Sequence, residues 1–440
     1  MVPGVVGAAR RFPRLVIAVA GVLGLMAGPA LAAVPPVLDT GGTAWVIVAS
    51  ALVLFMTVPG LALFYGGLVR ARNLLSVLMH CFVIACVVSL LWMAFGYSLV
   101  FDPGNPFIGS LDSAFLSGIR TRLQSNGLPE GAVALFQMTF AIITPALIIG
   151  AFTERVRFSF VILFSVIWLV VVYLPVAHWV WGGGWLAAWG TIDFAGGIVV
   201  HTTAGVSALV AAILVGPRDG FPHRLDPPHS PGMTMAGAGM LWVGWFGFNG
   251  GSALAADASA ASAILATHFA AAAAGLTWMT VEWLRLGKPT SVGIVTGCVA
   301  GLATITPASG YVGPAGAVVM GAAGGVLCLF ATNIVKSRLQ IDDSLDVFAV
   351  HGIGGMLGSL LVAAFALPQL GGAGFGHEIS ASGQLGAQAI GVAATALWSV
   401  LCTVVIIKLL GATVGIRVSV EDQREGLDLA THGERAYDFV

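Results

Sequence analysis

The stretch FSFVILFSVIWLVVVYLPVA, residues 158–177, contains no charged side chain. A helix of that length, rising 1.5 Å per residue, crosses the hydrocarbon core of a bilayer, which is about 30 Å thick. The rest of the chain has the same character, because 58% of its 440 residues are hydrophobic and 9% are charged, against about 25% charged in an ordinary soluble domain. We therefore expect an all-α polytopic membrane protein embedded in the lipid bilayer. The formal net charge of -1 provides no overall basic field, so nucleic acid is not an expected partner.

Apolar segments of spanning length recur along the sequence, and we count eleven of them. They begin near Ala44, Leu74, Ala132, Phe158, Phe194, Gly232, Ser259, Val292, Gly313, Ser344 and Ala387. Short cytoplasmic loops carry an excess of Lys and Arg, which tests the count. With the N-terminus outside, Arg120 and Arg122 fall in an outer segment, whereas the other fourteen basic residues after position 32 fall in inner segments. The sequence therefore predicts eleven transmembrane helices, with the N-terminus outside and the C-terminus cytoplasmic.

Residues 1–32 have the pattern of a signal peptide. Arg10, Arg11 and Arg14 precede the apolar run Leu15–Met26, and the small-residue sequence ALAA follows at 30–33. We expect cleavage after this segment, which leaves the mature N-terminus outside the cell inner (plasma) membrane. The alternative is a retained first transmembrane helix.

An odd number of spans permits an inverted five-plus-five repeat with one extra helix, a plan shared by many transporters. The first repeat would cover about 44–216, the second about 232–369, and the eleventh helix about 387–415. The fifth and tenth spans share the pattern V-H-x3-G around His201 and His351. Because these spans run in opposite directions, we expect both imidazoles about 10 to 14 Å from opposite faces, near the membrane midplane.

Ionisable side chains inside spans are costly and therefore mark candidate functional sites. His201 and His351 reach one depth from two separate spans, so they could share a hydrogen bond and offer a polar step to a small neutral solute or a proton. A metal site needs further ligands, and no carboxylate or thiol is placed at that depth, so we expect no metal or other cofactor. His80 and His268 are interpreted as packing residues.

Two carboxylates precede these histidines. Asp193, eight residues before His201, could cap backbone N–H groups at a Gly-rich helix start, or could lower the cost of bringing a cation nearby. Asp346, five residues before His351, allows the same two interpretations, and the structural one is favoured for it.

Aromatic side chains give the remaining indication. Phe136 and Phe140 are four residues apart and share a helix face, as do Phe248 and Ser252. Phenylalanines at this spacing usually belong to a helix core. Trp181, in the outer loop sequence HWVWGGG at 178–184, could belong to an interfacial belt or could present its π face to a small cation.

Six motifs follow one another along the mature chain. They are FQMTF (136–140), GAFTER (150–155), WGGG (181–184) continuing through DFAGG (193–197) to His201, WFGFNGGS (245–252), ITPA (305–308) and DDSLDVFAVHG (342–352). The series resembles the ammonium transporter family of the Amt, methylammonium permease and Rh type, and is most similar to the bacterial Amt branch. The likeness extends over nearly all of the mature chain.

This resemblance implies a homotrimer of eleven-helix subunits, each with its own pore. It also implies roles for particular residues: an outer ammonium site of Trp181, Phe140 and Ser252 with Thr306 beside it, a gate of Phe140 and Phe248, a hydrophobic pore lined by His201 and His351, and the supporting carboxylate Asp193. We add Phe136 to the outer site, because it shares a helix face with Phe140, and Asp346 as a second supporting carboxylate. Ammonium would lose hydration at the outer site, where cation–π contact compensates. The apolar bore penalises charge and so favours passage of ammonia. The sequence leaves open whether the separated proton follows, and methylammonium is expected as a second solute.

The tail, residues 416–440, is polar and is assigned to the cytoplasm. It resembles the C-terminal segment with which family members dock on the inner face and couple subunits, and where a PII signalling protein can block the pore. A disordered end is the alternative. For function, the alternative is an ammonium sensor or receptor with little flux. A general cation channel would need carboxylate rings or a carbonyl-lined filter, and an enzyme is least favoured because no activated nucleophile can be assembled.

Overall fold

The computed structural model describes residues 36–438 except 225 and 377. The stretch Leu38–Val440 forms one compact unit. The predicted signal peptide, residues 1–32, lies outside the described residues, so its cleavage stays a prediction. Regular structure in the described part of the chain is almost entirely helical. Its two strands, β1 (Gly104–Asn105) and β2 (Ile108–Gly109), form a short antiparallel hairpin in which Asn105 pairs with Ile108.

Several spans consist of α-helices joined end to end by a single π-helical or 3-10 turn. In the first half of the described chain the helices are α2 (Thr40–Phe55), η1 (Met56–Leu61), α3 (Ala62–Leu68), η2 (Ala71–Asn73), α4 (Leu74–Leu91), η3 (Trp92–Gly96), α5 (Tyr97–Phe101), η4 (Ala114–Leu116), α6 (Glu130–Ile148), η5 (Ile149–Ala151), α7 (Phe158–Trp168), η6 (Leu169–Tyr173), α8 (Leu174–Trp181), α9 (Trp185–Ala188), η7 (Gly197–Thr202) and α10 (Thr203–Val215). In the second half they are α11 (Pro231–Gly251), α12 (Ala258–Leu286), α13 (Ser291–Ile305), α14 (Pro314–Asn333), η8 (Ile334–Arg338), η9 (Phe348–Gly352), α15 (Ile353–Phe365), η10 (Pro368–Leu370), α16 (Ala381–Thr413), α17 (Val420–Glu425) and α18 (Leu427–His432).

The described residues contain 9 helices that are long and apolar enough to cross a membrane. The structure therefore agrees with an all-α, multi-pass membrane protein. Each of the eleven segments expected from the sequence contains a helix. However, α11 and the shorter α13 are not among those nine, so the count of eleven stays a prediction, as does the orientation of the chain.

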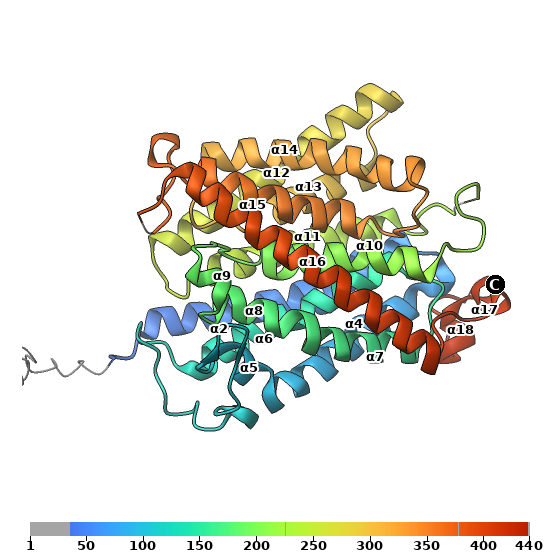
Figure 1. Ribbon diagram of the computed structural model, residues 1–440. Helices are drawn as coiled ribbons and strands as arrows, with labels where there is room; N and C mark the ends of the chain where they lie inside the picture. The colour runs from blue at the N-terminus through green and yellow to red at the C-terminus, as the bar shows by residue number, and fades with distance from the viewer. Residues whose placement is uncertain (1–35, 225, 377, 439–440) are drawn as a thin grey trace, which may run out of the picture. The chain divides into compact units, whose positions relative to one another are not determined.

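The helices that carry the two central histidines pack on each other reciprocally. His201 lies on η7, which packs on α15, and His351 lies on η9, which packs on α10. A glycine permits each close approach: a Cβ on Gly205 would collide with the backbone of Gly352, and a Cβ on Gly355 would collide with His201. The V-H-x3-G pattern thus has a steric cause, because each glycine makes room for the turn that carries the other histidine. In Figure 1, α16 runs obliquely across α10 and α15, and it packs on both of them.

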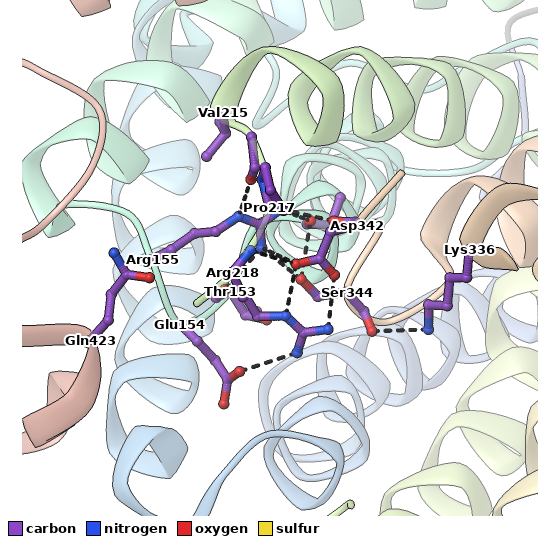
Figure 2. A network of polar contacts seen from close by, with 12 residues as sticks. Thr153, Glu154, Arg155, Val215, Pro217, Arg218, Lys336, Asp342, Ser344 and Gln423 are labelled. Carbon is purple, nitrogen blue, oxygen red and sulfur yellow. Dashed lines mark hydrogen bonds and ion pairs between the residues drawn. The ribbon is translucent and has the colours of Figure 1, made fainter. Parts of the chain in front are cut away.

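We call the two ends of the helical bundle the Trp181 end, where α9 lies, and the tail end, where α17 and α18 lie (Figure 1). A buried charge network holds the tail end together, and Figure 2 shows it at close range. Glu154 pairs with Arg70 at 3.0 Å and with Arg218 at 3.1 Å, while Arg218 also pairs with Asp342 at 2.8 Å. Burial by itself would raise the pKa of Glu154, but the charges of Arg218 and Arg70 and hydrogen bonds to the carboxylate lower it to about 2.

Arg155 lies at the centre of the same network and is fully buried. Its guanidinium donates to the Ser344 hydroxyl at 2.6 Å and to the backbone carbonyls of Ala151, Thr153, Asp342 and Gly216. Five acceptors on three separate loops satisfy the planar fork of donors, which only arginine provides. Arg155 therefore fixes the relative positions of the loops that follow α6, α10 and α14.

The C-terminal tail docks on the tail end of the bundle. The Asp428 carboxylate accepts hydrogen bonds from the backbone N–H groups of Leu75 at 3.1 Å and Ser76 at 2.8 Å, in the first turn of α4. The Asn73 side chain in turn accepts from the Leu427 N–H at 2.8 Å. A carboxylate at a helix N-terminus satisfies donors that have no partner within the helix, so the tail caps α4 from outside.

Candidate functional site

Asp193 organises the turn that carries His201. Its buried carboxylate accepts four backbone N–H groups at the start of η7, from residues 196–199, at 2.7 to 3.0 Å. Gly196 allows the backbone to turn around the carboxylate, because its φ is 112°, in the region that favours glycine. The geometry is that of a cap, the structural interpretation of Asp193. The Trp181 indole N–H donates at 2.8 Å to the Asp193 backbone carbonyl, so the same residue also orients the tryptophan.

Four aromatic rings meet beside this turn. Phe140 lies edge to face with Trp181, with ring centroids 5.7 Å apart and an interplanar angle of 88°, and it contacts Phe136 at 5.0 Å. On its other side Phe140 stacks on Phe248, with centroids 4.2 Å apart. Both phenylalanines of this stacked pair are at most 1% exposed. Trp181 belongs to the last turn of α8 and not to the loop in which we expected it.

Ser252 and Thr306, which the sequence grouped together, make different hydrogen bonds. Ser252 is only partly buried, and its hydroxyl donates to the Phe248 carbonyl at 2.8 Å. Thr306 is fully buried, accepting from the Trp245 indole N–H at 2.9 Å and donating to the Leu302 carbonyl at 2.7 Å. Trp245 also stacks on His201, so Thr306 holds a tryptophan that contacts the histidine layer.

The two histidines form a pair at the centre of the bundle. Their Nδ1 atoms are 3.3 Å apart and their rings are stacked, with an interplanar angle of 19°. One Nδ1 must donate and the other accept, so the two rings share a single proton between these atoms. Nε2 of His201 is buried and has no hydrogen-bond partner among the described residues. Within that part of the chain, no group of three His, Cys, Asp or Glu side chains is placed to hold a metal ion.

The His201–His351 pair lines an apolar cavity. Its walls are Met56, Leu61, Phe64, Ile143, Leu147, His201, Leu241, Trp245, Phe248, Val299 and His351. Phe248, which stacks on Phe140 and whose ring centroid is 6.1 Å from that of His201, is the member of the stacked pair that lines this cavity. A second cavity toward the tail end shares Phe64 and His351 with the first and reaches Asp346. The two cavities and the aromatic cluster therefore form one series of spaces and rings, from Trp181 past both histidines to Asp346.

Asp346 and Asp343 mark the tail end of this series. The Asp346 carboxylate pairs with Lys336 at 2.8 Å. The backbone of Asp346 has a φ of 61°, which is unusual for a residue other than glycine. The carboxylate of Asp343, and not that of Asp346, accepts a backbone N–H at the start of η9, from Phe348 at 2.8 Å. Sequence reasoning missed Asp343, although its eight-residue distance from His351 repeats that of Asp193 from His201. It also missed Trp245, because a tryptophan among apolar residues carries no signal of its own.

With this arrangement known, comparison with other proteins is informative. Residues 44–437 match the model of the Ammonium Transporter Family. The chain belongs to this family. It is 48% identical over 408 residues to an ammonium transporter of Aquifex aeolicus (strain VF5), a match that covers 91% of this chain and 94% of that protein. It is 44% identical over 406 residues to the ammonium transporter Amt1 of Archaeoglobus fulgidus, with 91% of this chain and 100% of the relative covered.

Solved structures of the family have the same fold. A sensor Amt protein superposes with a TM-score of 0.83 at 32% identity, over 89% of this chain and 98% of its own. Mep2 of Candida albicans superposes with a TM-score of 0.81 at 36% identity, over 88% of each chain. The bacterial and archaeal relatives confirm the resemblance identified from the six motifs.

Proposed function

We propose that this protein transports ammonium by binding the cation at its Trp181 end, removing a proton, and conducting ammonia past His201 and His351 toward the tail end. The observation that carries the proposal is the order of the groups. An aromatic cluster leads to a stacked phenylalanine pair, and the pair leads to two histidines in an apolar cavity. Such a series separates a place suited to a cation from a passage suited only to a neutral molecule.

The aromatic cluster supports recruitment of a small cation. A cation over a tryptophan or phenylalanine face gains about 0.5 to 2 kcal/mol, depending on desolvation. Ser252 donates its proton to the Phe248 carbonyl, which leaves the hydroxyl lone pairs free to accept a hydrogen bond from ammonium. Potassium has no N–H group to donate, so this acceptor favours ammonium over potassium.

The stacked pair and the cavity support deprotonation before passage. Phe140 and Phe248 are in van der Waals contact, so a ring must move to let a solute pass, and they serve as the gate. Moving an ion from water into an apolar medium costs tens of kcal/mol, far more than moving a neutral amine. Ammonium therefore gives up its proton at the gate to the histidine pair, where the Nε2 of His201 has no hydrogen-bond partner among the described residues. The proton then either follows along the pair or returns to the outer water, while the neutral ammonia passes along the imidazoles.

The rest of the proposal follows from the family resemblance. Three subunits form a homotrimer with one pore each, in the cell inner (plasma) membrane. Each subunit has eleven spans in an inverted five-plus-five repeat, with the Trp181 end outside and the tail in the cytoplasm. Methylammonium is a second solute, and a PII protein binds at the tail end.

Transport is tested with proteoliposomes that receive an ammonium pulse while current and internal pH are recorded. Potassium is the control cation. His201→Ala is compared with His268→Ala, which removes an exposed imidazole outside the cavities. We expect an ammonium-specific signal in the wild-type and His268→Ala proteins. In His201→Ala the signal should be lost or accompanied by potassium leak.

The combination of current and internal pH change identifies which species crosses the membrane. A current means that the proton follows the ammonia, whereas internal alkalinisation without current means that ammonia crosses alone. An unchanged, ammonium-specific signal in His201→Ala would remove the histidine pair from the mechanism. Ammonium binding with neither signal would replace transport by the sensor function.

A further inference from the structure

The two halves of the site carry matching carboxylates. Asp193 lies eight residues before His201, and Asp343 lies eight residues before His351. Each is buried, with exposed fractions of 6% and 0%, and each accepts a backbone N–H at the start of the π-helical segment that carries the histidine. Asp343 is thus the counterpart of Asp193 at the tail end of the bundle.

The two carboxylates differ in how completely they are satisfied. Both oxygens of Asp193 are used by four N–H groups. In Asp343, Oδ2 accepts from the Phe348 N–H, but the buried Oδ1 has no hydrogen-bond partner among the described residues. A buried carboxylate oxygen without a partner disfavours the charged form and leaves a place where a proton can sit.

The negative charge beside Asp343 also disfavours its charged form. Within the described part of the chain, Asp346 is the carboxylate and Lys336 the cation whose charges act on Asp343. From α3, Tyr65 interacts electrostatically with both carboxylates. Lys336 forms its ion pair with Asp346, at 2.8 Å. Burial and then the negative charge of Asp346 raise the pKa of Asp343 to about 7, although the Phe348 N–H and Lys336 oppose the rise.

We propose that Asp343 is a positioning residue for His351 that takes up and releases a proton at its unpartnered oxygen, so that the tail-end pH controls the pore. This inference rests on the proposed ammonium transport. The contact between Asp343 and η9 carries the effect, because His351 belongs to the same π-helical segment. An ionised carboxylate holds an N–H more firmly than a protonated one. Ionised Asp343 therefore keeps His351 against His201, and protonation loosens it.

The proton itself can be followed without any transport assay. Infrared difference spectra of the purified protein in lipid nanodiscs, titrated from pH 5 to 9, should contain a protonated-carboxyl band with a midpoint near pH 7. Asp343→Asn should remove this band. Asp346→Asn, which suits the left-handed backbone of that position, should lower the midpoint by about one unit because a neighbouring negative charge is lost. Lys336→Gln should raise the midpoint for the opposite reason.

The positioning role is tested by ammonium flux at varied tail-end pH, in vesicles where the pH of each side is set separately. We expect wild-type flux to rise about fivefold between pH 6 and 8, and Asp343→Asn to stay at the low level throughout. Glu434→Gln, which changes an exposed carboxylate of the tail, is the control, and its flux should keep the response to tail-end pH.

Two results would overturn the inference. One is a carboxyl band near pH 7 that persists in Asp343→Asn, and the other is an unchanged tail-end pH response in that variant. Loss of ammonium flux from the wild-type protein at every pH would instead refute the proposed transport, while the infrared titration would still decide whether Asp343 binds the proton.

Discussion

Replacing Glu154 with glutamine removes one charge from the network at the tail end and keeps the shape of the side chain. The carboxylate is buried and faces Arg70 at 3.0 Å and Arg218 at 3.1 Å. Its pKa falls from 4.5 to about 2 on folding, and at ~1.4 kcal/mol per unit this corresponds to about 3 kcal/mol of stability at pH 7. Breaking a buried ion pair costs about 3 to 5 kcal/mol, so the two estimates agree.

The pH dependence of this loss follows from the direction of the shift. A carboxylate whose pKa is lower in the folded state stabilises the protein fully above about pH 4.5, and the contribution is lost as the pH falls through about 2. Glu154→Gln should therefore unfold at a lower temperature than wild type at pH 7, and less than half of the free-energy difference should remain at pH 3.

The assay is thermal unfolding of the purified proteins in one detergent at both pH values. Glu434→Gln, which neutralises an exposed glutamate of the tail, is the control and should match wild type. A difference between Glu154→Gln and wild type that is equal at pH 7 and pH 3 would refute the electrostatic explanation. So would the absence of any difference at pH 7.

Three further perturbations follow from the geometry. Asp428→Ala removes the cap from two N–H groups of α4, so it should cost about 1 kcal/mol and raise hydrogen exchange in α18. Gly205→Ala forces a Cβ into the backbone of Gly352 and should separate the histidines, which reduced ammonium flux in a stably folded variant would show. Phe248→Ala removes a fully buried ring from the stack on Phe140; it should lower stability by about 3 to 5 kcal/mol and admit potassium, measured as a potassium current.

The pairing of His201 with His351 could be predicted from the sequence, because it depends mainly on the rise of a helix per residue and on the thickness of the membrane. Helix rise and membrane thickness place His201 and His351 at one depth, and the V-H-x3-G pattern reports the close contact that the glycines permit. The family resemblance paired Phe140 with Phe248, and in the structure the two rings stack. Periodicity alone places each phenylalanine on a helix face but does not indicate which face meets which.

Other features were not accessible, for identifiable reasons. Trp181 was expected in a loop because three glycines follow it, yet the helix continues until those glycines begin. The hydrogen bond between Thr306 and Trp245 joins two helices, and no local pattern encodes such a contact. Asp346 was selected because it is closer to His351 along the chain than Asp343 is. In the structure, however, it is the Asp343 carboxylate that accepts a backbone N–H at the start of η9.

The reciprocal glycine contacts have a consequence for synthesis. Each histidine-bearing turn reaches its final place only against the other, and the two histidines are separated by 150 residues. At about 5 to 20 residues added per second, roughly 8 to 30 s pass between the emergence of one turn and the arrival of its partner. During that interval the fifth span lies in the membrane with its small-residue face uncovered. The first half of the chain therefore spends this interval as an incomplete intermediate, in which the turn that carries His201 lacks the contacts that fix its final place.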